Sequence, residues 1–508
     1  MKYRLLIAAA ALCLLLGGCA PKQTPEPAAV SETVPAAEPV QEEPQPLPEP
    51  EPEPAPEPEP EPDHRTIVGD SCSACVYDEI SISKEQTLRS RRYVFDDETI
   101  IVMYRSESGK NAEFPVGSCP QQTGTIWFYD VQSGTMQSRP LEPGTYAENV
   151  LFLSLEDGSE YLVYTPKTYQ RIENGAILHQ PDCAGTLQIE AADGSLILTA
   201  AGVFSETSDF CDCTVFYSPT PKNDPQHINS CVFPFAAYTS DLEAKWCYDG
   251  YYYITPENYT PAGENCYYAC AASYLLKCMA NRIGLCPAAD ALSLAMTDTM
   301  LMSQNELGFW PTVSVSDWLR DDYGIGSGFY DTRFNTDFIQ ILWTISKKLG
   351  KNLYADALNA YASFYLQLAE KNHIETENGG WLVCDYWQEA EHQQTHSSLN
   401  HLMSECLALY HMNELLDRPE LEELAKKELQ AITDTAPGWV MENHDLHYCA
   451  FPDGTFGKED YPYLTYNDLL AMQQYLQNTG RETVPALEYL MDEKQIWMDE
   501  NGVTEYNH

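Results

Sequence analysis

The hydrophobic pattern of this 508-residue chain changes its period near residue 255. Before that point, short apolar runs alternate with turn residues, whereas after it apolar side chains recur every three or four positions. The first pattern is typical of antiparallel strands and the second of amphipathic helices. The sequence therefore predicts a multidomain chain, with a β-rich domain over residues 64–255 and a helical domain over residues 256–508.

Eight apolar segments of the first region have the length and composition of strands. They are residues 93–95, 99–104, 124–129, 150–153, 161–164, 187–189, 196–198 and 214–217. Gly134, Gly158 and Gly194 stand between such segments, as in hairpin turns. Segments such as residues 124–134 are similar to propeller blades, but only about four of them fit into the region. We predict an all-β sandwich or barrel, with an incomplete propeller as the alternative.

Five amphipathic helices are predicted in the second region. They cover residues 335–349, 354–371, 398–413, 417–432 and 465–476. The helices form pairs, and long connections rich in aromatic residues join the pairs. These connections cover residues 309–334, 378–396 and 438–464. Helical hairpins of this kind predict an all-α (α/α) toroid or half-toroid whose long loops gather at one end. Because long loops usually carry function, we expect the functional site among them.

The first 19 residues have the features of a lipoprotein signal peptide. The apolar run over residues 5–16 is too short to span a bilayer, which needs roughly 20 residues. Leu16, Gly17, Gly18 and Cys19 then have the look of a bacterial lipobox. We expect lipidation of Cys19 and attachment to the extracytoplasmic face of the cell membrane. An uncleaved anchor is the alternative, and it also exports the rest of the chain.

Residues 20–63 have the composition of a disordered stalk, with fifteen prolines between Pro21 and Pro62. A segment rich in Pro and Glu buries too little apolar surface to offset its ordering entropy. In a polyproline II conformation the stalk extends over on the order of 130 Å. It then lifts the domains away from the membrane, and a ligand for a proline-recognition module is the rival interpretation.

The net charge excludes one large class of partners. The whole chain carries −47, of which residues 64–508 contribute about −38. Such an acidic surface repels nucleic acid and other polyanions at long range. We therefore expect no nucleic-acid partner, and the acidity also disfavours a highly sulfated glycan.

Fifteen cysteines lie between Cys72 and Cys449, and in an exported protein disulfides are the default expectation. The odd total leaves at least one thiol unpaired or intermolecular. Two close pairs, Cys72 with Cys75 and Cys211 with Cys213, each resemble half of a zinc site. No second half has a matching spacing, so we expect neither a metal nor a cofactor.

The long connections contain the candidate binding residues. Arg333 stands at the mouth of a helix, where its guanidinium can clamp a sugar carboxylate, or alternatively pair with Asp337 at the helix start. In the second connection, Trp381 and Trp387 offer flat platforms. Asp385 and Tyr386 add a carboxylate and a further ring between them. The third connection combines two histidines, several acids and clustered tyrosines within residues 442–448 and 459–467.

Residues 380–476 resemble the C-terminal domain of the D-glucuronyl C5-epimerase family. This stretch is about a fifth of the chain, and the order and spacing of short motifs carry the resemblance. The matching pieces are Gly380-Trp381, Asp385-Tyr386, Ser398-Leu399-Asn400, His444-Asp445-Leu446, Asp460-Tyr461 and Asn467-Asp468-Leu469-Leu470. The family's fold, β modules before an (α/α) barrel, is similar to the one that the periodicity predicts.

The resemblance implies removal of the C5 proton of a uronic acid in a polysaccharide and its return to the opposite face. Tyr461 matches one acid–base residue of the family, and His444 stands where the family has a second tyrosine. The substrate-binding residues are then Arg333, Trp381, Asp385, Tyr386, Trp387, Asn400, Asp445, Asp460 and Asn467. A polysaccharide lyase and a non-catalytic glycan-binding lipoprotein are the alternatives.

Overall fold

The computed structural model describes residues 63–82, 86–107, 111–130, 132–225, 244–271, 274–350, 353–504 and 506. The lipobox with Cys19, and the predicted stalk except Asp63, lie outside these ranges. Residues Met1–Pro62 and Asp63–His508 form two separate units, and all described residues belong to the second.

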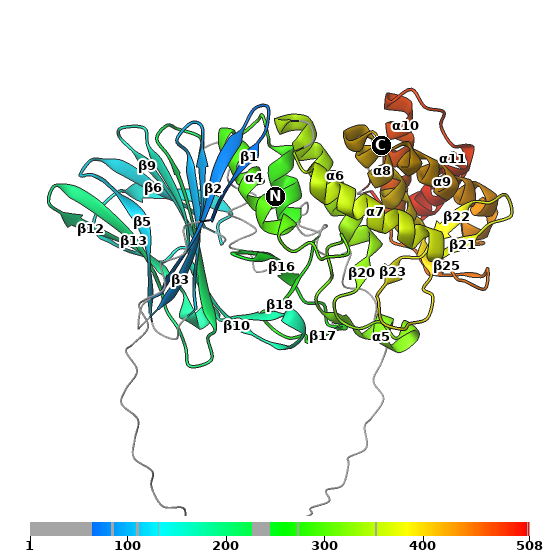
Figure 1. The fold of residues 1–508 in the computed structure, drawn as a ribbon, viewed down its shortest axis with the longest axis horizontal. Coiled ribbons are helices and arrows are strands. Elements are labelled where there is room, and N and C mark those ends of the chain that lie inside the picture. The colour runs from blue at the N-terminus through cyan, green and yellow to red at the C-terminus, as the bar shows by residue number, and fades with distance from the viewer. Residues whose placement is uncertain are drawn as a thin grey trace, which may run out of the picture. The chain divides into compact units, whose positions relative to one another are not determined.

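A 13-stranded antiparallel sheet occupies most of the N-terminal half of this unit, drawn in blue to green in Figure 1. Its main path runs β1 (Asp63–Val68), β2 (Ser73–Ile82), β3 (Thr87–Phe95), β4 (Ile100–Ser106), β14 (Phe210–Ser218), β10 (Glu160–Arg171), β11 (Ile177–His179), β18 (Cys266–Ala269), β16 (Gly250–Ile254) and β15 (Ala244–Cys247). Strand β9 (Val150–Leu155) pairs with β10 and with β6 (Gly124–Asp130), which pairs with β7 (Thr135–Pro140).

A second, four-stranded sheet packs against part of the large one. Its order is β5 (Ala112–Pro120), β13 (Ser195–Gly202), β12 (Thr186–Ala192) and β8 (Gly144–Tyr146). The alternation along β13 shows why it forms, since Leu196 and Leu198 are buried while Ile197 between them is 38% exposed. These leucines share a hydrophobic core with Leu153 of β9 and Val215 of β14.

The helices follow after residue 273. They are α3 (Tyr274–Asn281), α4 (Pro287–Leu301), α5 (Asp317–Tyr323), α6 (Thr332–Leu349), α7 (Ala355–Lys371), α8 (Leu399–Leu416), α9 (Pro419–Trp439), α10 (Leu464–Asn478) and α11 (Pro485–Glu500). The five predicted helices correspond to α6 to α10, and the eight predicted strand segments lie within strands of the two sheets. Local periodicity is therefore confirmed at the level of single elements.

Short strands run between the helices. They are β17 (Tyr259–Thr260), β19 (Val315–Ser316), β20 (Tyr330–Asp331), β21 (His373–Glu375), β22 (Trp381–Val383), β23 (Tyr386–Trp387), β24 (Ser397–Ser398), β25 (His447–Ala450) and β26 (Phe456–Glu459). They pair β17 with β19, β20 with β23, β21 with β22, and β25 with both β24 and β26.

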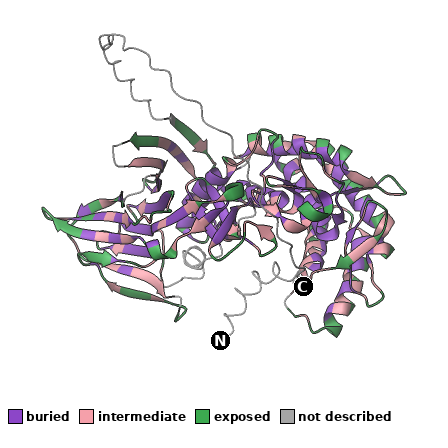
Figure 2. Cartoon of the chain, turned by 90° about the horizontal axis from the view of Figure 1, so that it is seen from below, coloured by how far each residue is buried: buried purple, intermediate pink, exposed green. Residues whose placement is uncertain are grey.

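The predicted architecture, an all-β sandwich, barrel or propeller followed by an all-α toroid, is wrong, although a β-rich region does precede a helical one. The large sheet crosses residue 255, because β16 pairs with β18, and the helical part contains strands of its own. One core also joins both parts. Tyr93 and Met103 of the sheet cluster with Leu292 of α4 and Phe338 of α6, and buried residues run through strands and helices alike in Figure 2.

Long-range contacts of this kind cannot be seen in local periodicity. The helix α4 contacts β4 and β16, and Asp298 of α4 pairs with Arg65 of β1 and accepts a hydrogen bond from the Tyr93 hydroxyl at 2.8 Å. The helices thus cover a face of the large sheet that a sandwich would bury against a second sheet. The two regions consequently fold around a shared interior.

The cysteines differ from the expectation based on the sequence. Eleven of the described cysteines are free thiols, so the expectation of disulfides is wrong for Cys72, Cys75, Cys119, Cys183, Cys211, Cys213, Cys247, Cys266, Cys384, Cys406 and Cys449. Most of them are buried and pack as small apolar side chains, as Cys213 in β14 and Cys406 in α8 do. In the described part of the chain, no helix combines the length and the apolar character needed to cross a bilayer.

Candidate functional site

The short strands bring the three long connections together. Strand β20 at the end of the first connection pairs with β23 in the second, so Asp331 lies opposite Tyr386. Strand β24, after the second connection, pairs with β25 in the third, so Ser398 lies opposite Cys449. Each backbone ladder therefore joins residues that are more than fifty positions apart in the sequence.

Asp331 is the N-cap residue of α6, and its carboxylate accepts a hydrogen bond from the Phe334 amide at 3.0 Å. Asp331 is buried, and burial raises the pKa of its carboxyl to about 7, although the amide hydrogen bond opposes the shift. A carboxyl group with such a pKa both accepts and donates a proton near neutral pH. Asp331 is therefore the strongest candidate for a general acid–base residue.

Four partly exposed tyrosines form a connected group that reaches this carboxyl through two of its members: Tyr259 of β17, Tyr386 of β23, Tyr448 of β25 and Tyr461 before α10. We call them the tyrosine cluster. Asp331 interacts electrostatically with Tyr259 and Tyr386, and the rings of Tyr448 and Tyr461 meet edge to face at 5.7 Å. Burial raises the pKa values of Tyr386 and Tyr448 well above the ordinary value. These two phenols consequently stay protonated and act as hydrogen-bond donors.

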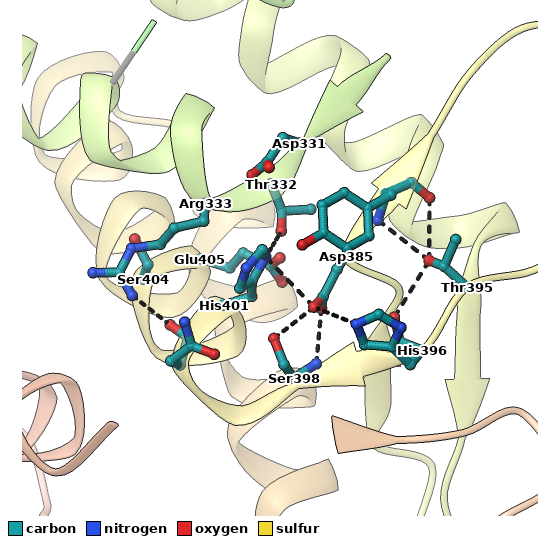
Figure 3. A network of polar contacts seen from close by, with 12 residues as sticks. Asp331, Thr332, Arg333, Asp385, Thr395, His396, Ser398, His401, Ser404 and Glu405 are labelled. Atoms are coloured by element: carbon teal, nitrogen blue, oxygen red, sulfur yellow. Dashed lines mark hydrogen bonds and ion pairs between the residues drawn. The ribbon is translucent and has the colours of Figure 1, made fainter. Parts of the chain in front are cut away.

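Asp385 lies behind the cluster in a fully buried polar network, shown in Figure 3. Its carboxylate accepts hydrogen bonds from the Ser398 amide at 2.8 Å and from the Ser398 hydroxyl at 2.5 Å. The His396 Nε2 atom lies 3.3 Å and the His401 Nδ1 atom 3.6 Å from the same carboxylate. Burial favours a raised pKa, but His401, His396 and Ser398 together hold the pKa of Asp385 below its ordinary value.

The two aspartates thus differ in protonation. Asp385 is ionised at neutral pH, whereas the pKa of Asp331 is about 7. The negative charge of Asp385 contributes to the raised pKa of Asp331. Pairs of carboxyl groups whose environments separate their pKa values are typical of acid–base sites. Ser398 links Asp385 to the cluster, because its hydroxyl also hydrogen-bonds with the Tyr448 phenol.

A lysine and an indole extend the site on one side. The ring of Trp318 in α5 meets Tyr386 edge to face at 5.7 Å, and the Lys458 Nζ atom lies 4.1 Å from the centre of the Trp318 ring. Lys458 has a backbone φ of 60°, a left-handed conformation that costs free energy for a residue with a side chain. The ammonium group of Lys458 thus lies over Trp318, which in turn contacts Tyr386 of the tyrosine cluster.

Arg333 does not point to a free binding position. Its guanidinium donates to Asp337 at 3.0 Å and to Asp468 at 2.6 Å, and also to the Asn400 carbonyl at 3.2 Å. Burial opposes its charge, but the two carboxylates keep the pKa of Arg333 above the ordinary value. Of the two alternatives for this residue, the structure contains the ion pair with Asp337.

His444 and Tyr461 have different neighbours. The His444 Nδ1 atom lies 2.6 Å from Glu493 of α11, and the imidazole is 45% exposed. Tyr461 instead packs on Tyr448 within the tyrosine cluster. Tyr461 thus contacts Tyr448 and interacts with Tyr259 of the cluster, whereas the contact of His444 is with Glu493.

The remaining predicted residues make mostly structural contacts. Trp381 stacks on His373 at 4.1 Å, and Trp387 packs on Phe364 at 5.7 Å. Asp445 and Asp460 both pair with the fully buried Lys494, and burial raises the pKa of Asp460 to about 6. Asn400 is buried at the start of α8, and Asn467 lies partly buried in the first turn of α10.

Sequence reasoning missed Asp331, Tyr259 and Tyr448. Asp331 carries a detectable signal, since an aspartate directly before an amphipathic helix is a common N-cap. Tyr259 has none, because it precedes the first predicted helix by more than 70 residues and reaches the site through the pairing of β17 with β19. In the described residues, no group of His, Cys, Asp or Glu side chains has the arrangement of a metal site.

No family model and no curated relative matches the chain. Among solved structures, it is similar to a D-mannose isomerase, at 10% identity and a TM-score of 0.36 over 53% of this chain and 70% of that one. A family 76 glycoside hydrolase from a bovine Bacteroides thetaiotaomicron strain aligns at 9% identity and a TM-score of 0.35 over 83% of this chain and 77% of its own. These identities and TM-scores are too low to assign a fold or a function to this chain.

Proposed function

We propose that this protein is an enzyme that acts on a uronic-acid-containing polysaccharide by acid–base proton transfer, as a C5-epimerase does. The observation that supports the proposal most is the buried carboxyl of Asp331, which lies opposite Tyr386, interacts with Tyr259, and has a pKa raised by burial to about 7. The epimerase-like reaction needs a base near pH 7 and donors that stabilise an enolate-like charge. Asp331 supplies the first and the tyrosine cluster the second.

The proton transfers follow from the protonation states. The ionised form of Asp331 removes the proton at C5 of the uronic acid, and the electron pair moves onto the sugar carboxylate. Protonated phenols such as Tyr386 donate hydrogen bonds to the charge that develops there. Tyr461, which matches an acid–base residue in the family resemblance, returns a proton to the opposite face of C5.

The sugar carboxylate needs a neighbouring cation. It already carries one negative charge, and removal of the C5 proton adds a second. Arg333 is occupied by Asp337 and Asp468. Lys458 lies over Trp318 at the edge of the tyrosine cluster, and we assign the carboxylate contact to its ammonium group. His444 has no part in this assignment.

A polysaccharide lyase is the second candidate. It is favoured by the contacts within the cluster, because the base Asp331 and the donors Tyr259 and Tyr386 interact directly with one another. In an elimination the same base removes the C5 proton, and a neighbouring phenol protonates the leaving oxygen at C4. No second proton donor on the opposite face of the sugar is then required.

Incubation with uronate-containing polysaccharides in deuterated water tests the proposal. Deuterium at C5 of intact polymer indicates epimerisation, and absorbance from a new double bond indicates elimination. The variant Asp331→Asn should abolish either signal, whereas Asp322→Asn, which changes an exposed aspartate of α5, should retain it. Binding of the polymer with neither signal would refute the enzymatic proposal and support a glycan-binding lipoprotein.

We also propose attachment to the extracytoplasmic face of the cell membrane through lipidated Cys19. The lipobox and the Pro-rich stalk of the sequence support this assignment. Expression of the full chain in a bacterial host should place it in the membrane fraction, and Cys19→Ala should prevent incorporation of labelled fatty acid. Equal labelling of both forms would refute the assignment.

A further inference from the structure

A fully buried ammonium group lies at the base of the hairpin that β25 and β26 form. It belongs to Lys494 of α11, which has no exposed surface. The Lys494 Nζ atom lies 2.5 Å from Asp445, two residues before β25, and 3.0 Å from Asp460, directly after β26. Both carboxylates are themselves buried. One cation therefore holds the two ends of the hairpin against the same helix.

This hairpin and the segment after it carry two phenols of the tyrosine cluster. Tyr448 lies in β25, and Tyr461 directly follows Asp460. Their rings meet edge to face at 5.7 Å. The Asp460 carboxylate also hydrogen-bonds with the Tyr461 backbone and accepts a hydrogen bond from the Thr465 hydroxyl at 2.5 Å. The backbone position of Tyr461 consequently depends on a carboxylate that Lys494 holds in place.

The backbone at both ends of the hairpin is strained. His444, next to Asp445, has a φ of 67°, and Lys458, two residues before Asp460, has a φ of 60°. A residue with a side chain keeps this left-handed conformation only where surrounding contacts impose it, and such residues cluster at functional sites. The ion pairs of Lys494 lie at these two ends, so they are contacts that can impose the strained geometry.

The charges show why the cation is needed. Two carboxylates that share a buried region repel each other, and a buried ammonium without a partner costs much free energy. Each carboxylate here lies against the ammonium and also accepts a further hydrogen bond, Asp445 from the Leu446 amide and Asp460 from Thr465. A carboxylate held in this way is not available to a substrate. Its effect on the site passes through the backbone.

We propose that Lys494 is a positioning residue for Tyr448 and Tyr461, on which it acts through Asp445 and Asp460. The inference rests on the proposed function, because that function gives Tyr461 the return of a proton to C5. A displacement of about 1 Å in a reacting group can lower a rate by about 10²-fold. Loss of the ammonium should therefore lower kcat, whereas KM for the polysaccharide should change little.

Kinetics of three variants of the full chain test the proposal. Lys494→Met keeps an unbranched side chain without its charge, and should lower kcat by about 10²-fold. The triple variant Lys494→Met/Asp445→Asn/Asp460→Asn removes all three charges, so no unpaired carboxylate remains to unfold the protein. It should still show the lowered kcat, because no cation joins the two ends of the hairpin. Asp298→Asn, which breaks a buried ion pair between α4 and β1, should keep the wild-type kcat.

A spectroscopic measurement tests the same inference without turnover. The detergent-solubilised full chain is labelled with 3-fluorotyrosine, and the ¹⁹F resonances of the two tyrosines are assigned by their absence in Tyr448→Phe and Tyr461→Phe. Both resonances should shift in Lys494→Met and in the triple variant. They should stay unchanged in Asp298→Asn.

Three outcomes would overturn the inference. They are a wild-type kcat in the triple variant, unchanged ¹⁹F resonances of Tyr448 and Tyr461 in that variant, and an equal loss of kcat in Asp298→Asn, which would reflect general destabilisation. Absence of turnover in the wild type would instead refute the proposed reaction. The ¹⁹F shifts would then decide by themselves whether Lys494 holds the two tyrosines.

Discussion

Asp331 and Tyr386 face each other across the antiparallel pair of β20 and β23. Directly opposite residues of two strands project to the same side of the pair, so the carboxyl and the phenol share one environment. The pairing joins the connection before α6 to the connection before α8. Two backbone segments that periodicity treats as separate loops thus form one site.

Asp331→Asn should lower turnover by about 10²- to 10⁴-fold, the usual contribution of a general acid–base group. Asparagine is also a good N-cap, so α6 should remain intact. The wild-type rate should rise with pH through an inflection near the pKa of about 7. A rate profile over pH 5–9 for both forms checks this expectation, and an unchanged profile would exclude Asp331 as the base.

The same substitution should stabilise the fold, and more strongly at alkaline than at acidic pH. Folding raises the pKa of Asp331 from its ordinary value of 3.8 to about 7, so the folded state binds more protons between these values. Stability contributed by this group is therefore lost as the pH rises through that interval. Urea unfolding should show a larger gain for Asp331→Asn at pH 8 than at pH 5, and a pH-independent difference would contradict the shift.

Tyr461→Phe and His444→Gln form a matched pair of tests. The first removes a phenol from the tyrosine cluster and should reduce turnover by at least about tenfold. The second changes an exposed imidazole that contacts Glu493, and should alter turnover by less than about twofold. Initial rates on the same polysaccharide check both. A large loss in His444→Gln alone would restore the family-based assignment of His444.

Lys458→Ala should raise KM for a uronate polymer by about tenfold, because one ammonium–carboxylate contact is lost. The same polymer with chemically reduced carboxyl groups is not turned over, so its Kd is measured instead, and this Kd should match that of the wild type. Lys426→Ala, on the exposed face of α9, is the control. Equal effects of Lys458→Ala on both polymers would show that Lys458 does not contact the carboxylate.

Arg333→Leu should destabilise the fold by about 3–5 kcal/mol, because it leaves Asp337 and Asp468 without their shared partner. Arg320→Leu, at an exposed position of α5, should change stability by about 0.5 kcal/mol or less. Urea unfolding measures both. A selective rise in KM for the uronate polymer, without loss of stability, would instead make Arg333 a substrate clamp.

A buried carboxyl pair gives a second test of stability. The Tyr365 hydroxyl lies 2.7 Å from Glu405 Oε2 and 3.0 Å from Glu428 Oε1. One hydroxyl has one proton, so it donates to one carboxylate and must accept from the other, which is therefore protonated. Burial raises the pKa of Glu428 to about 8, and also raises that of Glu405.

Glu428→Gln should therefore stabilise the protein at alkaline pH. The folded state binds more protons than the unfolded state between pH 4.5 and about 8, so wild-type stability falls as the pH rises through this interval. Glutamine keeps the hydrogen bonds without the charge, and its curve should be flatter between pH 6 and pH 9. Glu423→Gln, an exposed site on α9, should leave the wild-type slope unchanged.

Local pattern and distant contact contributed differently to this fold. The strand and helix segments follow from side-chain periodicity within ten to twenty neighbouring residues, and they were predictable. The large sheet was not predictable. No local pattern near Tyr252 indicates that β16 pairs with β18 as well as with β15. The candidate site divides in the same way, with Tyr386 and Tyr461 foreseen and Tyr448 missed.

Amino-acid order alone established the acidity, the Pro-rich stretch and the sequence of β-rich and helical regions, because each depends on composition or short-range spacing. The tertiary structure decided which side chains form ion pairs and how the pKa values of buried groups shift. Arg333 became an ion-pair residue because Asp468, 135 residues away, lies against it. Asp331 became an acid–base candidate because packing removes water from its carboxyl, and no local pattern encodes that loss of solvation.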